Sequence, residues 1–173
     1  AKITKKYLFI LSIPIFFSNL ALPMVGLVDT ALVGHLENSQ FLAATSVATS
    51  IITMIFWSFG FLRMGTTGLV AQALGKGDYR ELVMIVVRNL AIGVFISLIL
   101  ILLKDQFLAI INYFFFISGE TMLLVSDYIS IRILSAPAEL TLYVIIGTFL
   151  GLQKTKISSL IVIIYSLLNI LLS

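Results

Sequence analysis

Long apolar stretches alternate with short polar links along the whole chain. The apolar stretches cover residues 7–34, 41–74, 82–103, 121–150 and 157–173. Crossing the hydrocarbon core of a bilayer takes about 20 helical residues at 1.5 Å each. Four stretches exceed that length, and the fifth is expected to be a truncated span. None shows the in–out alternation of a barrel strand of about 10 residues, so the pattern predicts an all-α polytopic membrane protein.

The composition agrees with a lipid environment. Of the 173 residues, 60% are hydrophobic and 11% charged, whereas soluble domains have about 45–50% and 25%. This excludes an ordinary cytosolic enzyme, a disordered segment and a nucleic-acid-binding module. The chain has no cysteine and one histidine, His35, so neither thiolate nor multi-histidine metal sites are expected. No nucleophile or phosphate-loop motif is present, so we expect neither catalytic residues nor a cofactor, and leave any metal ligands unknown.

Basic residues concentrate on alternate links. One set of links, with the segments beside them, holds Lys2, Lys5, Lys6, Lys76, Arg80, Arg88, Lys154 and Lys156. The opposite set holds Lys104 as its one cation. The positive-inside rule therefore predicts a cytoplasmic N-terminus in a bacterial inner membrane.

A shorter segment, residues 104–117, lies between the third and fourth stretches. Its apolar residues recur on one side of a short helix, from Phe107 to Phe115. We expect this helix to lie in the interface of the outer leaflet. A simple extension of the third span is the alternative.

Five charged residues fall inside the predicted spans: Asp29, Arg63, Asp127, Arg132 and Glu139. A charge in the hydrocarbon costs roughly 2.5–3.5 kcal/mol on insertion scales and needs a partner. Arg63 and Glu139 each lie about 18 Å from the inner end of their span, so we predict a structural ion pair between them. Arg132 is expected to face either Asp29 or Asp127.

Asp29 lies about 8 Å below the outer end of the first span. A partly desolvated carboxylate at this depth suits proton exchange, and it suits Na⁺ if other oxygens complete the ligand shell. Pro14 and Pro23 are expected to bend the helix and free backbone carbonyls. The alternative is that Asp29 only ends the helix near the headgroups.

Small and hydroxyl residues recur in the second stretch. Thr45, Thr49 and Thr53 form a stripe that lines an aqueous cavity or, as more commonly seen, bonds to backbone or a neighbouring helix. Gly60, Gly65 and Gly68 are expected to allow close helix packing.

Several strings resemble the multidrug and toxic compound extrusion (MATE) transporters, most closely their DinF-like branch. The matching strings are GLVDTALVGHL (26–36), GFLRMGTTGLVAQALG (60–75), RILSAPA (132–138) and GTFLGLQ (147–153). The resemblance implies a twelve-helix antiporter with two six-helix lobes, of which residues 1–173 are the N-terminal lobe. It also implies export of cationic or amphipathic small molecules against H⁺ or Na⁺, with a C-terminal lobe of the same longer chain as partner.

The resemblance assigns roles to individual residues. Asp29 matches the ion-coupling aspartate of the first helix, and Pro14 the proline at which that helix bends. Asn169 matches the asparagine of an Asn-x-x-x-Asp pattern, but Ser173 stands where relatives have the aspartate. The alternatives are a lipid-linked precursor flippase of the same superfamily and a non-transporting membrane subunit or degenerate fragment.

Overall fold

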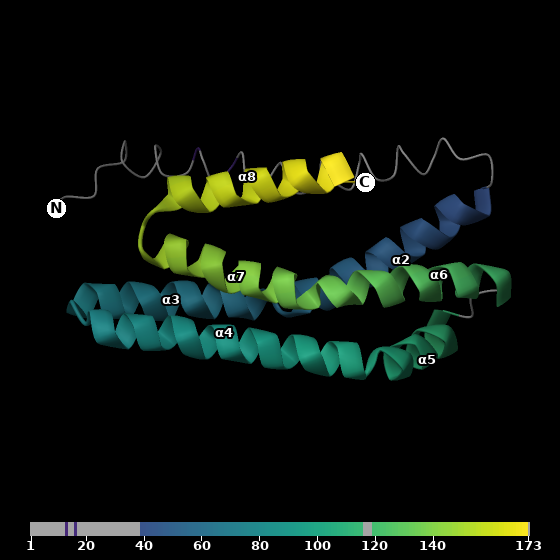
Figure 1. Ribbon diagram of the computed structural model, residues 1–173, viewed down its shortest axis with the longest axis horizontal. Coiled ribbons are helices and arrows are strands. Elements are labelled where there is room, and N and C mark those ends of the chain that lie inside the picture. Colours follow the sequence, from purple (N-terminus) through teal and green to yellow (C-terminus); the bar gives the residue numbers. More distant parts are fainter. Residues whose placement is uncertain (1–12, 14–15, 17–38, 116–118, 173) are drawn as a thin grey trace.

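The chain folds into long, roughly parallel helices, as the computed structural model shows in Figure 1. The structure describes residues 13, 16, 39–115 and 119–172. The first predicted span, with Pro14, Pro23 and Asp29, therefore lies outside the described residues.

The described helices follow one another with short links. They are α2 (Ser39–Ser58), α3 (Gly60–Lys76), α4 (Tyr79–Leu102), α5 (Lys104–Phe115), α6 (Gly119–Arg132), the 3₁₀ turn η1 (Ile133–Ser135), α7 (Ala136–Gly151) and α8 (Thr155–Leu172). In the part of the chain that the structure describes, all regular structure is helical, which confirms the predicted all-α class.

Among the described residues, three helical stretches are long and apolar enough to cross a membrane. They are Ala44–Lys76, Tyr79–Leu102 and Thr121–Gly151, with mean hydropathies of 1.5, 2.5 and 1.7. The apolar part of α8, Thr155–Leu168, is shorter. The 33 residues of the first stretch extend about 50 Å, well beyond a hydrocarbon core of about 30 Å. The chain is therefore a polytopic membrane protein.

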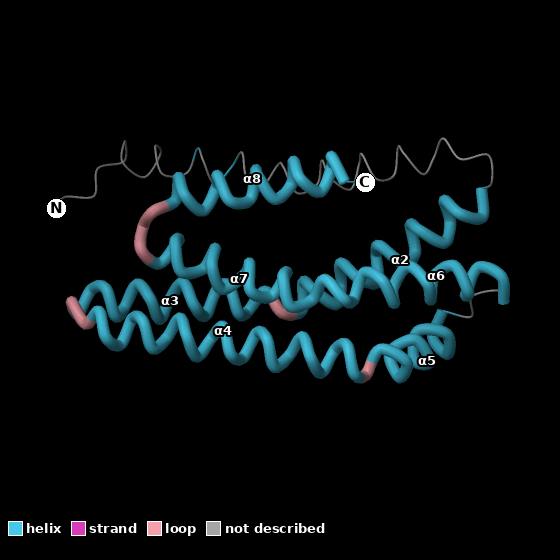
Figure 2. Tube along the Cα trace, viewed as in Figure 1, coloured by secondary structure: helices cyan, strands magenta, loops and turns pink. Residues whose placement is uncertain are grey.

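The helices pack side by side in pairs, with α4 beside two of them. α2 packs against α6 and α3 against α7, while α4 contacts both α3 and α7. The α3–α4 and α7–α8 links lie at the same end of the bundle (Figure 2). Gly77, with φ of 72°, ends α3, and the Asp78 side chain caps α4 by accepting from the Glu81 N–H at 2.8 Å.

Two stretches expected as single spans each consist of two helices. Pro137 has no N–H to donate to the carbonyl of Ile133, and the helix tightens into η1 just before it. The second break lies at Phe59, between Ser58 and Gly60. The Ser58 hydroxyl donates to the Met54 carbonyl at 2.8 Å, a bond that bends helices, and Gly60 weakens the next turn.

The two breaks lie at matching positions, because the helices before them pack together and so do the helices after them. Buried residues from both sides of both breaks form one apolar cluster, including Phe56, Leu62, Ile133 and Leu140. The breaks therefore divide this part of the bundle into two segments, whereas α4 runs past them without interruption.

Residues 104–115 of the expected interfacial segment form α5. Leu108 and Ile111 are buried in the apolar cluster, while Ile110 and Tyr113 are exposed. One side of the helix therefore packs into the bundle while another is exposed, and its location at a membrane interface stays a prediction.

Candidate functional site

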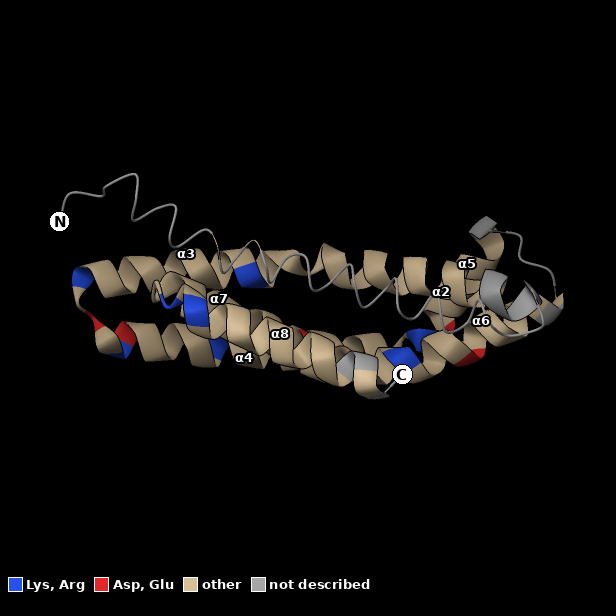
Figure 3. Cartoon of the chain, turned by 90° about the horizontal axis from the view of Figure 1, so that it is seen from above, with Lys and Arg blue, Asp and Glu red and all other residues tan. Residues whose placement is uncertain are grey.

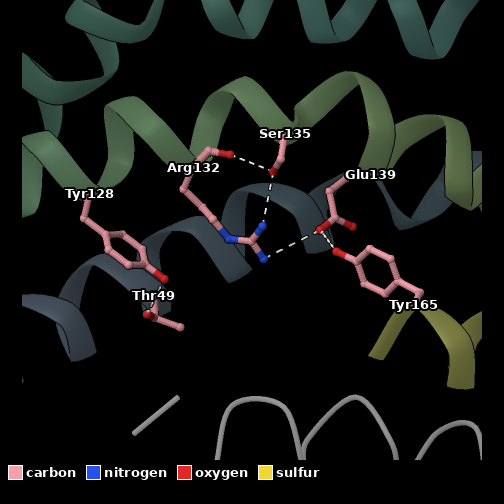
Figure 4. Close-up of polar contacts among 6 residues, drawn as sticks. All are labelled: Thr49, Tyr128, Arg132, Ser135, Glu139 and Tyr165. Atoms are coloured by element: carbon pink, nitrogen blue, oxygen red, sulfur yellow. Dashed lines mark hydrogen bonds and ion pairs between the residues drawn. The ribbon is translucent and has the colours of Figure 1, made fainter. Parts of the chain in front are cut away.

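A cluster of polar side chains lies at the break between α6 and α7 (Figure 4). The Tyr165 hydroxyl, on α8, donates to Oε1 of Glu139. Nη2 of Arg132 lies 3.7 Å from the same oxygen. The Glu139 side chain is 11% exposed and that of Arg132 34%. One carboxylate oxygen therefore joins the end of α6, the start of α7 and the middle of α8.

Ser135 completes the connection inside the break. Its hydroxyl donates to the Arg132 carbonyl at 2.7 Å and accepts from Nη1 of Arg132 at 3.3 Å. The guanidinium is thereby held by both the turn and the carboxylate. We call Arg132, Ser135, Glu139 and Tyr165 the break cluster.

The break itself favours these charges. Arg132 is in the last turn of α6, and Glu139 is in the first turn of α7. A helix C-terminus carries partial negative charge and an N-terminus partial positive charge, so each charged group lies at the helix end of opposite sign. Splitting the span at Pro137 thus creates two favourable positions for charge inside an apolar bundle.

The predicted ion pair between Arg63 and Glu139 is not the one that forms among the described residues. Glu139 pairs with Arg132. The reason is the register of α3 against α7: a Cβ placed on Gly147 would lie 2.6 Å from the Arg63 carbonyl oxygen. Gly147 follows Glu139 by eight residues, or about 12 Å along α7. The main chain of Arg63 therefore lies two turns away from Glu139.

Arg132 was expected to face Asp29 or Asp127, and its acidic partner in the structure is Glu139. Asp127 is exposed on α6. Asp29 lies outside the described residues, so its role stays a prediction.

One member of the predicted hydroxyl stripe reaches a neighbouring helix. The Thr49 hydroxyl donates to the Tyr128 hydroxyl at 3.3 Å, which joins α2 to α6 (Figure 4). Beside it, α2 carries an open hollow of about 600 Å³ lined by Thr49, Ser50, Thr53, Met54, Trp57 and Ser58. Its lining combines hydroxyls with a thioether and an indole, and it includes no charged side chain.

Close approach of helices occurs on α7 rather than at the predicted glycines of α3. Cβ atoms built on Gly147 and Gly151 would lie 2.6 and 2.7 Å from carbonyl oxygens of α3. Cβ atoms built on Gly60, Gly65 and Gly68 would have no atom of the described residues within 4 Å. Among the described residues no helix approaches the α3 glycines closely, and α3 contacts α7 through the side that holds its buried residues, such as Thr66 and Val70.

The remaining predicted site residues lie apart from this cluster. Asn169 is in the last turn of α8. Its side chain, like Asp29, Pro14 and Pro23, is outside what the structure describes. Sequence reasoning missed Tyr128, Ser135 and Tyr165, although a tyrosine one turn from an intramembrane arginine, as Tyr128 is from Arg132, is a usable signal.

Comparison with known families supports the resemblance inferred from the sequence strings. The family model described as MatE matches residues 14–173. The chain belongs to the MatE family. This match confirms the predicted family. Figure 3 shows that charged residues are few along the helices of the chain.

Two named relatives agree with this assignment. DNA damage-inducible protein F of Escherichia coli (strain K12) is 33% identical to this chain, over 96% of this chain and 36% of its own length. Multidrug export protein MepA of Staphylococcus aureus (strain NCTC 8325 / PS 47) is 25% identical over 78% of the chain and 30% of its own length. This chain thus spans about a third of the length of these curated relatives. No solved structure matches it.

Proposed function

We propose that this chain is the N-terminal lobe of a cation-coupled exporter of cationic or amphipathic small molecules. It would work by alternating access together with a C-terminal lobe of the same longer protein. Membership of the MatE family carries this proposal, supported by a relative named as a multidrug export protein. The proposed orientation in a bacterial inner membrane has the N-terminus on the cytoplasmic side. The reason is that the N-terminal segment belongs to the set of links rich in Lys and Arg, which the positive-inside rule assigns to the cytoplasm.

Asp29 is the proposed coupling residue, with H⁺ or Na⁺ as the ion and Asn169 nearby in the ion site. The proposal rests on family resemblance and on the cost of a carboxylate inside a span. Pro14 and Pro23 would let the first helix bend when the charge of Asp29 changes.

Asp29→Asn is expected to abolish ion-driven export while leaving the protein folded, because an amide neither exchanges a proton nor carries charge. The measurement is efflux of a fluorescent lipophilic cation from proteoliposomes of the full-length protein, driven separately by a pH gradient and a Na⁺ gradient. Asp127→Asn is the matched control, since Asp127 is exposed on α6. Ion-driven efflux at the wild-type rate in Asp29→Asn would remove Asp29 from coupling.

The hollow on α2 is the proposed contact for the substrate. Trp57 is 81% exposed and Met54 73% exposed beside the hydroxyls. An indole face attracts cations by about 0.5–2 kcal/mol, and a thioether adapts to varied apolar shapes. The lining therefore suits a molecule with an apolar body, which the thioether contacts, and a positive charge, which the indole face attracts.

Trp57→Ala is expected to weaken binding of tetraphenylphosphonium, a lipophilic cation, by roughly two- to thirtyfold. Equilibrium binding to the purified full-length protein measures the effect, and Trp57→Phe should retain part of the affinity. Leu102→Ala, at an exposed apolar residue of α4, is the control for lost apolar area. Equal affinities in all four proteins would show that the hollow faces lipid only.

A further inference from the structure

We propose that the break cluster is a latch that holds α8 in place relative to the α6–α7 hinge, with Tyr165 and Glu139 as its positioning residues. The Tyr165–Glu139 hydrogen bond is the connection, and the Arg132–Glu139 pair anchors it across the break. This role is separate from ion coupling by Asp29 and from substrate contact at the α2 hollow.

The break between α6 and α7 has the features of a hinge. An uninterrupted helix resists bending because each turn is bonded to the next, whereas Pro137 removes one such bond and η1 replaces regular α-helical geometry. The neighbouring break at Phe59 lies at the matching position of the packed partner helix. Bending at both breaks together would therefore move α2 and α6 as one segment against α3 and α7.

The break cluster connects the two sides of this hinge. Arg132 belongs to the segment before the break and Glu139 to the segment after it. Residues seven apart do not normally pair along a continuous helix, where partners are three or four apart. A change in the angle between α6 and α7 would alter the 3.7 Å separation of Nη2 and Oε1 directly.

The same oxygen, Oε1 of Glu139, also binds α8 through Tyr165. α8 packs against α7, and its buried side chains are all short: Thr155, Ser158, Ser159, Val162 and Ser166. Short side chains interlock little with a neighbouring helix and therefore resist sliding or tilting weakly. Tyr165 is the long side chain that reaches across this contact to Glu139, as Figure 4 shows. Its bond therefore fixes α8 where the apolar packing alone does not.

Spin-label distances in the full-length protein test the latch without reference to transport. Residues 1–173 contain no cysteine, so labels can be attached at introduced cysteines here once any cysteine elsewhere in the full-length protein has been replaced. Leu123 on α6 and Leu168 on α8 are exposed and report across the hinge. Leu69 on α3 and Val87 on α4, also exposed, form a control pair on the far side of the breaks.

Tyr165→Phe cuts the bond to α8 but keeps the ring and the ion pair. The expected result is a broader or shifted Leu123–Leu168 distance distribution with an unchanged Leu69–Val87 distribution. Glu139→Gln keeps a side-chain oxygen that can accept from both the Tyr165 hydroxyl and the Arg132 guanidinium, so it should retain the wild-type Leu123–Leu168 distribution. A wild-type distribution in Tyr165→Phe, or an equally broad one in Glu139→Gln, would overturn the latch.

A double variant separates the latch from simple packing. Glu139→Ala removes both the Tyr165 bond and the Arg132 pair, so it should broaden the Leu123–Leu168 distribution at least as much as Tyr165→Phe does. Adding Tyr165→Phe to Glu139→Ala should broaden the distribution no further, because the bond to Tyr165 is then already absent. Independent, additive broadening would overturn the proposal. If Glu139→Ala does not fold, the comparison of Tyr165→Phe with Glu139→Gln still decides.

One consequence rests on the proposed function. If α8 must stay in step with the hinge during export, Tyr165→Phe should lower the efflux rate by about two- to tenfold, the effect of one hydrogen bond. The distance measurements need no transport, so failure of the Asp29→Asn experiment would leave the latch standing. Conversely, an unaltered Leu123–Leu168 distribution in Tyr165→Phe would remove the latch and leave the proposed coupling untouched.

Discussion

Glu139→Leu is expected to lower the free energy of unfolding by about 3 kcal/mol, and Arg132→Leu by a similar amount. Each change leaves the other charge unpaired inside a membrane-spanning bundle. Breaking a buried ion pair costs about 3–5 kcal/mol, and the lower end applies here because the Arg132 side chain is a third exposed. The same size follows from insertion scales, on which an intramembrane arginine costs roughly 2.5–3.5 kcal/mol.

Removing the whole cluster should cost far less than removing half of it. Apolar replacement of both members of a buried pair is often neutral or stabilising. The triple variant Arg132→Leu, Glu139→Leu, Tyr165→Phe leaves neither an unpaired charge nor a tyrosine hydroxyl without its acceptor. We expect its stability to lie within about 1 kcal/mol of the wild type.

Denaturant unfolding of the full-length protein in detergent micelles measures these differences. Arg80→Gln and Asp127→Asn are the controls, since both residues are exposed and surface changes stay within about 0.5 kcal/mol. Single variants as stable as these controls would mean that water solvates Arg132 and Glu139. In that case the two charges would not depend on each other.

The polytopic architecture could be predicted from the sequence because it follows from a single physical requirement. Placing backbone in lipid forces it into helices, and a run of apolar residues marks where they lie. The two breaks were equally accessible in principle, since Pro137 and the Ser58–Gly60 region are local signals. They were missed because hydropathy remains high through both breaks, so that one apolar stretch conceals two helices.

The partner of Glu139 could not be obtained in the same way. Counting residues from each span end assumes that all spans begin at one membrane depth, and the register of α3 against α7 departs from that by two turns. Arg132, Glu139 and Arg63 were all recognised as costly charges. Which of them meet depends on helix rotation and axial shift, which are set by packing at positions such as Gly147 rather than by the charges.

Adding a methyl group at the α3–α7 contact is the second change expected to have a large effect. A Cβ on Gly147 would lie 2.6 Å from the Arg63 carbonyl oxygen, and one on Gly151 would lie 2.8 Å from the Val70 Cβ. Backbone atoms and a β-carbon cannot rotate away, so the helices must separate. Overpacking of this kind costs about 1–3 kcal/mol per site.

Gly147→Ala and Gly151→Ala should therefore lower the unfolding free energy in detergent, and the two together by more than either alone. Gly65→Ala and Gly68→Ala are matched controls of opposite expected sign. Their Cβ atoms would meet no atom of the described residues within 4 Å, and alanine in a helix interior is favoured over glycine by roughly 0.5–1 kcal/mol. The same chemical change should thus destabilise on α7 and stabilise on α3.

This difference in sign is a strict test of the axial register, since helix propensity alone favours alanine at all four positions. If Gly147→Ala stabilised the protein as Gly65→Ala does, α3 and α7 would not meet at this point. The two-turn separation between Arg63 and Glu139 would then lose its structural basis. A loss confined to the α7 variants supports the register that keeps the main chain of Arg63 two turns away from Glu139, and so leaves Glu139 to pair with Arg132.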